Sequence, residues 1–353
     1  MRAFQRFVAF LLTLLIIGST FVACGKEEKE IDIYLIAGQS NANGTTKITN
    51  GDEIYEDFPA LQNGVPNVHY AGNARSDKSG AVVDRKFDWQ PVKLGMGYQS
   101  NRMGPEAGMA KVFSTYYNEE SGKECGILKM AHGGTGLCNT GGNGSNAFGD
   151  WSPPSFSKWP DENVSIKNKY VGGCYRAFIS EVRQRLSELQ EYGGYTKINI
   201  KGLYWMQGCN DTWRYKTDKI SYPKAFSCLV SDLRRDVAEI VNELQGNDGG
   251  AANMPFFIGT ISRTYRMRND DPNGTPEATA ARNLPFIEMQ KKLAEDNENC
   301  YVVDNSVYDV MRWDYELNKA VVVGTDEAHW GQADCYTIGQ NVGKMMLEKC
   351  IDD

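Results

Sequence analysis

The sequence predicts an α/β fold in three layers, α/β/α, with a flavodoxin-like parallel sheet of about five strands at its centre. Short runs rich in β-branched and aromatic residues alternate with longer segments of helical spacing, which favours a parallel sheet with right-handed crossovers. The 353 residues, 41% hydrophobic and 24% charged, have the composition of a globular protein with a substantial core. Because neither an internal repeat nor a Pro/Ser linker follows residue 30, we expect one domain over 31–353.

The first half of this domain contains two predicted strands and one helix. The run 31–37 is β-rich and ends at a glycine, whereas 41–100 is rich in Gly, Asn and Asp and is predicted to be mostly loop. Helix 107–117 begins where Pro and Glu suit a first helical turn. A second strand is expected over 125–131, before a Gly-Gly pair and a long surface insertion at 135–165.

The second half continues the alternation. Apolar residues at helical spacing predict a helix over 170–190, and Pro285 is expected to kink or begin the helix that contains it. The remaining predicted elements are strands over 198–206, 255–262 and 300–304, and helices over 222–244, 278–297 and 332–350.

The N-terminal segment has the pattern of an export signal. Two arginines precede the apolar run 7–17, and the small residue Ala23 stands before Cys24, which resembles the lipobox of bacterial lipoproteins. We therefore expect 1–23 to be a lipoprotein signal peptide and 24–30 a charged tether. The protein would then be exported and anchored to the bacterial cell envelope, at its periplasmic face or on the cell surface, through a lipid on Cys24. An uncleaved anchor or an ordinary signal peptide is the alternative.

Charge and residue counts exclude several classes of site. The net charge of −7 argues against nucleic acid as a partner, and three histidines argue against a histidine-rich metal site. Eight cysteines remain after Cys24, and an oxidising compartment would permit disulfides among them, although buried free thiols are the alternative.

Polar clusters follow several of the predicted strands, at 38–41, 132–135 and 207–211, and a fourth lies at 326–329. Ligands of parallel sheets bind beyond the carboxyl ends of the strands, so these clusters can converge on one site.

The clusters contain the residue types of nucleophilic catalysis. Ser40 follows a glycine on a strand-to-helix turn, and Asp326 lies three residues before His329, close enough to orient an imidazole base. Gly134 and an amide of the 207–211 cluster are candidate oxyanion donors. Each residue also has an ordinary structural interpretation: a turn or cap for Ser40 and Asp326, and a surface position for His329.

Five short motifs in this order resemble the SGNH-type carbohydrate acetylesterases, and most closely the sialate O-acetylesterase and carbohydrate esterase family 6 group. They span residues 31 to about 345 and read Gly-Gln-Ser-Asn at 38–41, Gly-Pro-Glu at 104–106, Gly-Gly-Thr at 133–135, Trp-Met-Gln-Gly at 205–208 with Asp211, and Asp-Glu-Ala-His at 326–329.

This resemblance implies an SGNH hydrolase fold and a catalytic triad. In that triad Ser40 is the nucleophile, and Asp326 and His329 are the other two members. It also implies that backbone N–H groups of Ser40 and of Gly134, or alternatively Gly133, line an oxyanion hole, without metal or cofactor.

The third oxyanion donor is open between Gln207, which matches the acetylesterase subgroup, and Asn210, which matches the wider SGNH pattern; we favour Gln207. Cys209 stands where the subgroup has Glu and puts the hydrogen bonding of this loop in doubt.

The implied function is an exported serine esterase that removes O-acetyl groups from carbohydrates, with acetylated xylan-type chains or acetylated sialic acid as substrates. A glycan-binding lipoprotein without activity on the same scaffold is the alternative. Four tryptophans lie near the motifs or in long loops, where they can stack on sugars or serve the core: Trp151, Trp159, Trp213 and Trp330. Of the two remaining histidines, His132 is expected beside the oxyanion loop and His69 in a loop without a role.

The lipobox makes a direct prediction. Replacing Cys24 with Ser removes the thiol that accepts the lipid, so Cys24→Ser should move the protein from the membrane to the soluble fraction, measured by fractionation and immunoblot. A variant that stays in the membrane would contradict the lipobox interpretation.

Overall fold

The computed structural model describes residues 28–73, 75–76, 81–84, 86–138, 149–157, 171–268 and 272–351. The predicted signal peptide, Cys24, most of the tether and Trp159 lie outside the described residues. Within those ranges, no helix combines the length and apolar character needed to cross a bilayer.

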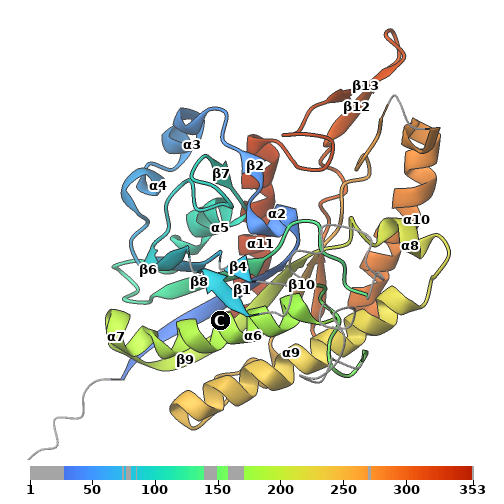
Figure 1. The fold of residues 1–353 in the computed structure, drawn as a ribbon. Coiled ribbons are helices and arrows are strands. Elements are labelled where there is room, and N and C mark those ends of the chain that lie inside the picture. Colours follow the sequence, from blue (N-terminus) through green and yellow to red (C-terminus); the bar gives the residue numbers. More distant parts are fainter. Residues whose placement is uncertain are drawn as a thin grey trace, which may run out of the picture.

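A seven-stranded sheet forms the centre of the molecule (Figure 1). All neighbouring strands are parallel except β3 and β6, which run antiparallel at one edge. The predicted parallel α/β fold is therefore confirmed, with seven strands instead of about five. The spatial order is β11 (Cys300–Val303), β10 (Phe256–Gly259), β9 (Tyr195–Met206), β1 (Lys29–Gly38), β8 (Cys125–Ala131), β3 (Val68–Gly72) and β6 (Phe87–Pro91).

The two additional strands, β3 and β6, lie in the stretch 41–100 that was predicted to be mostly loop, and that prediction is wrong. They are short and bounded by Gly, Asn and Pro, so the open edge of β8 decides their conformation more than local propensity does. His69 consequently lies in β3, where its ring bonds Glu124 at 2.8 Å and the Tyr192 hydroxyl at 2.8 Å. The expectation that His69 lies in a loop is therefore wrong.

The five predicted helices are present in the predicted order, as six helices with corrected boundaries. The predicted helix 170–190 starts later and is divided into two helices. Pro285 does not begin its helix, because Pro276 and the Thr275 cap begin that helix nine residues earlier. Their bounds are α5 (Glu106–Phe113), α6 (Gly173–Ser187), α7 (Leu189–Gly193), α9 (Ser221–Gln245), α10 (Pro276–Asp296) and α11 (Gln332–Cys350).

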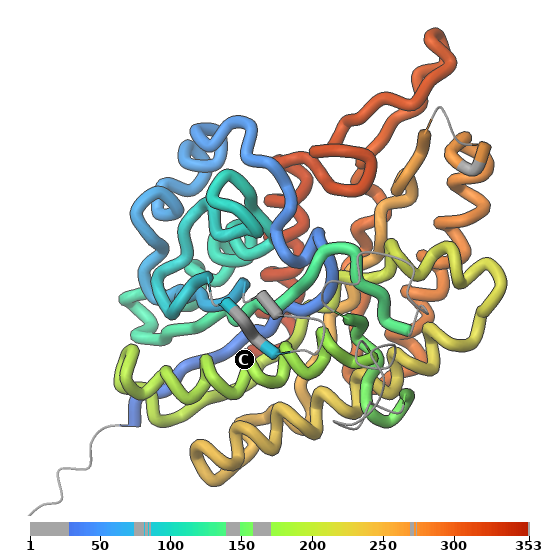
Figure 2. The backbone as a smooth tube through the Cα atoms, viewed as in Figure 1, coloured from blue at the N-terminus to red at the C-terminus, as the bar shows by residue number. Residues whose placement is uncertain are grey.

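The helices cover both faces of the sheet, with α5 and α11 packed together on one face and α6 and α9 on the other (Figures 1 and 2). Two glycines bring α5 and α11 close together. A Cβ on Gly108 would lie 2.0 Å from Tyr336 O, and one on Gly339 would lie 2.2 Å from Pro105 O. The pair therefore requires glycine at both positions, and it fixes the C-terminal helix against the start of α5.

Shorter elements surround the sheet, among them a hairpin of β12 and β13 that projects from the body (Figure 2). The remaining bounds are α2 (Ser40–Asn43), β2 (Thr46–Lys47), α3 (Gly51–Asp57), α4 (Ala60–Asn63), β4 (Arg75–Ser76), β5 (Val82–Asp84), β7 (Arg102–Met103), α8 (Thr212–Tyr215), η1 (Ala251–Asn253), η2 (Pro272–Gly274), β12 (Met311–Asp314) and β13 (Lys319–Val322).

The eight cysteines after Cys24 all lie in the described part of the chain and all are free thiols. Six of them are buried, so they serve the core as small apolar side chains. Trp151 and Trp330 are also buried, whereas Trp213 is 36% exposed and lies under the Arg282 guanidinium.

Candidate active site

Three parallel strands end side by side at the candidate site. Gly38 at the end of β1 pairs with Ala131 of β8 and with Met206 of β9. Gly38 has a φ of +138°, and a Cβ there would lie 2.2 Å from Met206 O, so only glycine fits. The amide of Gln39 donates to Met206 O at 2.9 Å. The turns that follow the three strands therefore start from one point, as the sequence predicted.

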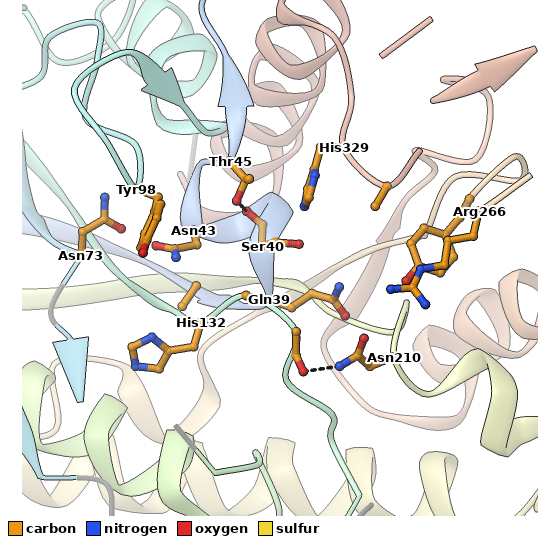
Figure 3. Close-up of a pocket in the computed structure, with 15 residues that line it drawn as sticks. Gln39, Ser40, Asn43, Thr45, Asn73, Tyr98, His132, Asn210, Arg266 and His329 are labelled. Carbon is orange, nitrogen blue, oxygen red and sulfur yellow. Dashed lines mark hydrogen bonds between the residues drawn. The ribbon is translucent and has the colours of Figure 1, made fainter. Parts of the chain in front are cut away.

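A cavity of about 370 Å³ opens at this edge of the sheet (Figure 3). It brings together Ser40, Gly134, Asn210 and His329 from four separate segments of the chain. Its lining consists of Gln39, Ser40, Asn43, Thr45, Asn73, Tyr98, Ala131, His132, Gly133, Gly134, Asn210, Tyr265, Arg266, Ala328 and His329. Gln207 is not among them.

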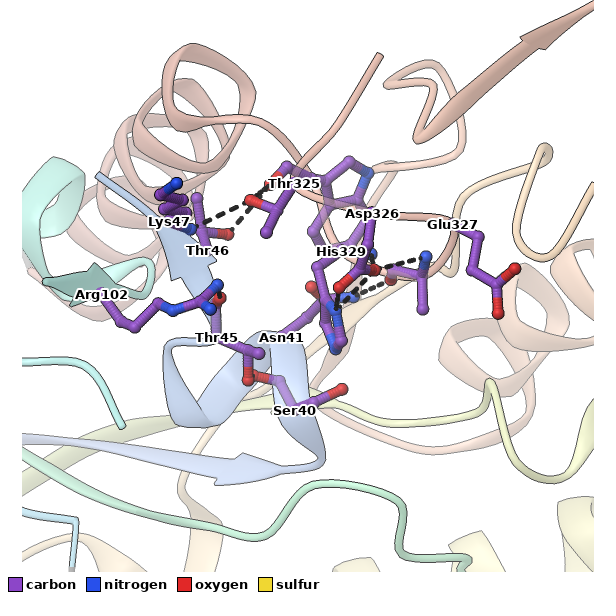
Figure 4. A network of polar contacts seen from close by, with 12 residues as sticks. Ser40, Asn41, Thr45, Thr46, Lys47, Arg102, Thr325, Asp326, Glu327 and His329 are labelled. Carbon is purple, nitrogen blue, oxygen red and sulfur yellow. Dashed lines mark hydrogen bonds and ion pairs between the residues drawn. The ribbon is translucent and has the colours of Figure 1, made fainter. Parts of the chain in front are cut away.

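Asp326 and His329 form a hydrogen-bonded pair (Figure 4). His329 Nδ1 lies 2.8 Å from each carboxylate oxygen of Asp326, and the amides of Ala328 and His329 donate to Asp326 Oδ1 at 2.8 and 3.0 Å. Burial acts to raise the pKa of Asp326, but the hydrogen bonds and the attraction of His329 outweigh it, so this pKa lies below its usual value. The carboxylate therefore stays ionised and fixes the imidazole with Nδ1 toward it.

The loop that carries His329 is fastened to the segment that follows Ser40 (Figure 4). Asn41 Nδ2 donates to Ala328 O at 3.2 Å, and Thr46 Oγ1 donates to Trp330 O at 3.2 Å. The amide of Lys47 donates to Thr325 Oγ1 at 3.0 Å. These three bonds connect parts of the chain that are more than 270 residues apart and hold His329 beside Ser40.

Ser40 is the first residue of α2, directly after the end of β1. Gly133 lies opposite, since a Cβ on that glycine would stand 3.5 Å from the Ser40 Cβ. Among the described residues, no hydrogen bond joins Ser40 Oγ to His329 Nε2, although both side chains line the cavity. Catalytic hydrogen bonds are often long or misaligned in the absence of substrate, so this geometry is compatible with a nucleophile and its base.

Gln207 lies beneath the cavity, fully buried. Its Nε2 donates to Asp211 Oδ2 at 2.6 Å and to Thr135 O at 3.0 Å, while its Oε1 accepts from the Tyr222 hydroxyl at 2.8 Å. Burial raises the pKa of Asp211 to about 6, against the opposing effect of hydrogen bonds from Gln207 and Leu137. Gln207 therefore does not line the cavity. Its amide instead stabilises the loop 207–211 through these buried hydrogen bonds.

Asn210, the other candidate amide, lies at the cavity. It lines the cavity, and its Nδ2 donates to the carbonyl oxygen of Gly134 (Figure 3). Gly134 has a φ of +72°, which favours glycine. The bond joins the turn after β9 to the turn after β8, so Asn210 is the amide side chain that the geometry places next to Ser40 and Gly134.

A buried ion pair lies behind the cavity. Lys129 Nζ is 2.7 Å from Glu106 Oε2, and both side chains are at most 1% exposed. Lys129 also donates to Met96 O at 3.3 Å, and the amide of Gly104 donates to Glu106 Oε1 at 2.9 Å. The pair therefore holds both ends of the 96–104 loop, which carries Tyr98 into the cavity wall.

Several cavity residues were missed in the sequence: Asn43, Thr45, Asn73, Tyr98, Tyr265 and Arg266. Most come from segments without regular local patterns, so no motif marked them. The tryptophans proposed for sugar stacking do not line the cavity in the described residues; Tyr98, 47% exposed, is the aromatic side chain that does so most openly. Among the described residues, no group of three or more His, Cys, Asp or Glu is placed to hold a metal ion.

The chain matches one protein family over most of its length. The family model described as carbohydrate esterase, sialic acid-specific acetylesterase, matches residues 30–348. The chain belongs to this family. Its members are carboxylic ester hydrolases that act on acetylated carbohydrates, which confirms the resemblance and the enzyme class expected from the sequence. No curated protein gave a significant match.

Several solved structures are similar to this acetylesterase. The crystal structure of NanS has 15% sequence identity and a TM-score of 0.54, covering 91% of this chain and 98% of its own. A carbohydrate acetylesterase from Xanthomonas citri has 14% identity and a TM-score of 0.47, covering 90% of this chain and 55% of its own. Est24, a carbohydrate acetylesterase from Sinorhizobium meliloti, has 10% identity and a TM-score of 0.41, covering 90% and 99%. At 15% identity, the likeness to NanS concerns the fold alone.

The buried ion pair behind the cavity makes a testable prediction. Glu106→Gln and Lys129→Met should each lower the free energy of unfolding by about 3–5 kcal/mol, because each leaves one buried charge unpaired. The double variant should lose clearly less than the sum of the two, since no lone charge remains. Urea unfolding of the four proteins measures this, and losses that simply add would show that the two charges are not coupled.

Proposed function

We propose that this acetylesterase is a serine hydrolase in which Ser40, His329 and Asp326 form the catalytic triad. The observation that carries the proposal is the Asp326–His329 pair, whose imidazole shares one cavity with the Ser40 side chain. A serine requires a neighbouring base, and that base requires an orienting carboxylate. The spacing, the ionised Asp326 and the family membership support these roles together.

The proposed reaction begins when Ser40 Oγ attacks the acetyl carbonyl while His329 Nε2 accepts the hydroxyl proton. The tetrahedral intermediate collapses, the bond to the sugar oxygen breaks, and His329 returns the proton to that oxygen. Water then attacks the acetyl-enzyme in the same manner, releasing acetate and restoring Ser40. Asp326 stabilises the imidazolium in both halves and remains ionised throughout.

We assign the oxyanion hole to the backbone N–H groups of Ser40 and Gly134 and to the side chain of Asn210. Asn210 lines the cavity and already holds the Gly134 turn, whereas Gln207 is engaged by Asp211, Thr135 and Tyr222. Donors of this kind act because they are fixed before charge develops on the carbonyl oxygen.

We also propose that the enzyme is exported and held at the bacterial cell envelope by a lipid on Cys24. The basic and apolar segments before Ala23-Cys24 support this location. An esterase on the outside of a cell meets acetylated glycans before they are taken up; xylan-type chains and acetylated sialic acid are both substrates of suitable chemistry.

The triad is tested by single and double replacement. Ser40→Ala and His329→Ala should each reduce kcat for a chromogenic acetate ester by about 10⁴-fold or more, and the double variant should lose little further, because triad members act as a unit. Ser187→Ala, which changes an exposed serine of α6, is the matched control. Substantial acetate release by Ser40→Ala would refute the nucleophile.

The third donor is tested by comparing two amides. Asn210→Ala should lower kcat by about 10²–10³-fold with little change in KM, because the interaction strengthens only in the transition state. Gln207→Ala should instead lower the free energy of unfolding by about 1–3 kcal/mol, since it leaves buried polar groups without a partner. The measurements are steady-state kinetics and urea unfolding. Loss of kcat confined to a well-folded Gln207→Ala would reverse the assignment.

A further inference from the structure

Asn73 carries a hydrogen-bond acceptor that nothing in the described part of the protein satisfies. The residue directly follows β3, lines the catalytic cavity and is only 4% exposed. Its Oδ1 is buried without a partner among the described residues. The reaction proposed for Ser40 does not use this atom. A buried acceptor without a donor costs about 1–3 kcal/mol, so a ligand that supplies a donor gains free energy there.

The neighbouring bonds determine which end of the Asn73 amide is left without a partner. Asn73 Nδ2 donates to Met96 O at 2.9 Å. The same carbonyl also accepts from the Tyr70 hydroxyl at 3.2 Å and from Lys129 Nζ at 3.3 Å. Turning the amide over would bring Oδ1 against this carbonyl oxygen, so that two acceptors would face each other. The atom without a partner is therefore the oxygen, and an oxygen of this kind can only accept.

The backbone at this position would also suit glycine. Asn73 has a φ of +56°, and its backbone N–H donates to Lys129 O at 2.9 Å. Glycine adopts the left-handed region without cost, and asparagine tolerates it better than most residue types. Replacement by glycine would remove the side chain without straining the backbone, and Met96 O would keep two of its three donors. The role of the amide can therefore be tested separately from the fold.

An exposed aromatic ring lies at the same end of the cavity. Figure 3 shows Asn73 and Tyr98 at one end, with Ser40 toward the middle. The Tyr98 backbone is held from two sides, since Lys86 Nζ donates to Tyr98 O at 2.8 Å and Tyr98 N donates to Gly44 O at 2.9 Å. Because the residue is 47% exposed, its ring offers an apolar face against which a sugar can pack.

The size of the cavity determines what kind of group reaches the amide. A volume of about 370 Å³ is at the small end for ligand sites, so the cavity holds about one sugar unit. The acetyl carbon must lie next to Ser40 Oγ for attack, which leaves the remainder of the same sugar to contact Asn73. The hydrogen-bond donors that every sugar carries are its hydroxyl groups. An oxygen that is esterified no longer donates.

We propose that Asn73 Oδ1 accepts a hydrogen bond from a free hydroxyl of the acetylated sugar, and that the enzyme therefore selects partly acetylated sugars over fully acetylated ones. The inference rests on the proposed esterase function and adds the residue that recognises how the sugar is substituted. A site built to bind a substrate hydroxyl discriminates strongly against analogues without it, because its own polar group then stays unpaired. Acetylation of that hydroxyl removes the donor and adds bulk beside a buried atom.

The test compares sugars that differ in one hydroxyl. The probes are methyl glycosides of xylose and of N-acetylneuraminic acid that carry a single O-acetyl group, with p-nitrophenyl acetate as an ester without a sugar. Each monoacetate is compared with its deoxy counterparts and with its fully acetylated form. For at least one monoacetate, removal of one hydroxyl should lower kcat/KM by about 10–100-fold, and full acetylation should lower it to a similar degree. The two sugars separate a pentose from a nine-carbon sugar as the source of the hydroxyl.

Variants assign the preference to the amide. Asn73→Gly should abolish the difference in kcat/KM between the monoacetate and its deoxy counterpart. Because this ratio is measured within one enzyme preparation, a loss of folded protein cannot produce the result. Asn67→Gly is the matched control: Asn67 directly precedes β3 with a φ of +59°, donates through Nδ2 to Lys123 O and does not line the cavity. This variant should keep the full preference.

Four outcomes would overturn the inference. Equal kcat/KM for the monoacetates and all their deoxy counterparts, or acetate release from p-nitrophenyl acetate but from no sugar, would refute hydroxyl recognition and leave the esterase function intact. A fully acetylated form hydrolysed as fast as its monoacetate would refute the selectivity. An Asn73→Gly variant that keeps the preference would show that another group binds the hydroxyl. No acetate release from any probe would refute the esterase function and the inference together.

Discussion

The close approach of β1 to β9 at Gly38 is the constraint on which the candidate site depends. Gly38 pairs with Ala131 on one side and Met206 on the other, and its backbone leaves no space for a Cβ. Because the three strands end at one level, the turns behind them deliver a hydroxyl, a glycine N–H and an amide to one cavity. A sheet with a wider or staggered end would separate these groups by several ångströms. A displacement of that size greatly lowers the rate of a reaction that depends on precisely positioned groups.

The Asp326–His329 pair was predictable because its geometry is local. Asp326 and His329 are three residues apart on one turn, so the carboxylate reaches Nδ1 without help from distant segments. The surroundings of that turn were not predictable. Asn73 and Arg266 enter the cavity through left-handed backbone conformations, with φ of +56° and +53°, for which neither residue type gives a reliable local signal.

Gln207 and Asn210 show why motif matching alone does not tell which amide lines the cavity. Both follow the same strand, and residue type does not tell which of the two side chains points toward the cavity. The buried carboxylate of Asp211 accepts hydrogen bonds from the Gln207 amide and the Leu137 backbone. These bonds hold Gln207 in the interior, and Asn210 lines the cavity. The fold shows the same division. The alternation of strand and helix patterns predicted the five parallel strands β1, β8, β9, β10 and β11. In contrast, β3 forms because β8 offers an edge, and β6 pairs with β3.

The strand order also governs when this chain can fold. β1 is the first strand to leave the ribosome, yet it lies in the interior of the sheet, where Ile33 pairs with Gly126 and with Ile200. Its partner β8 follows about a third of the way along the chain, but its partner β9 is absent until more than half of the chain has been synthesised, and non-local pairing of this kind is slow. The centre of the sheet, and with it the edge that carries the cavity, therefore cannot be completed before β9 has been made.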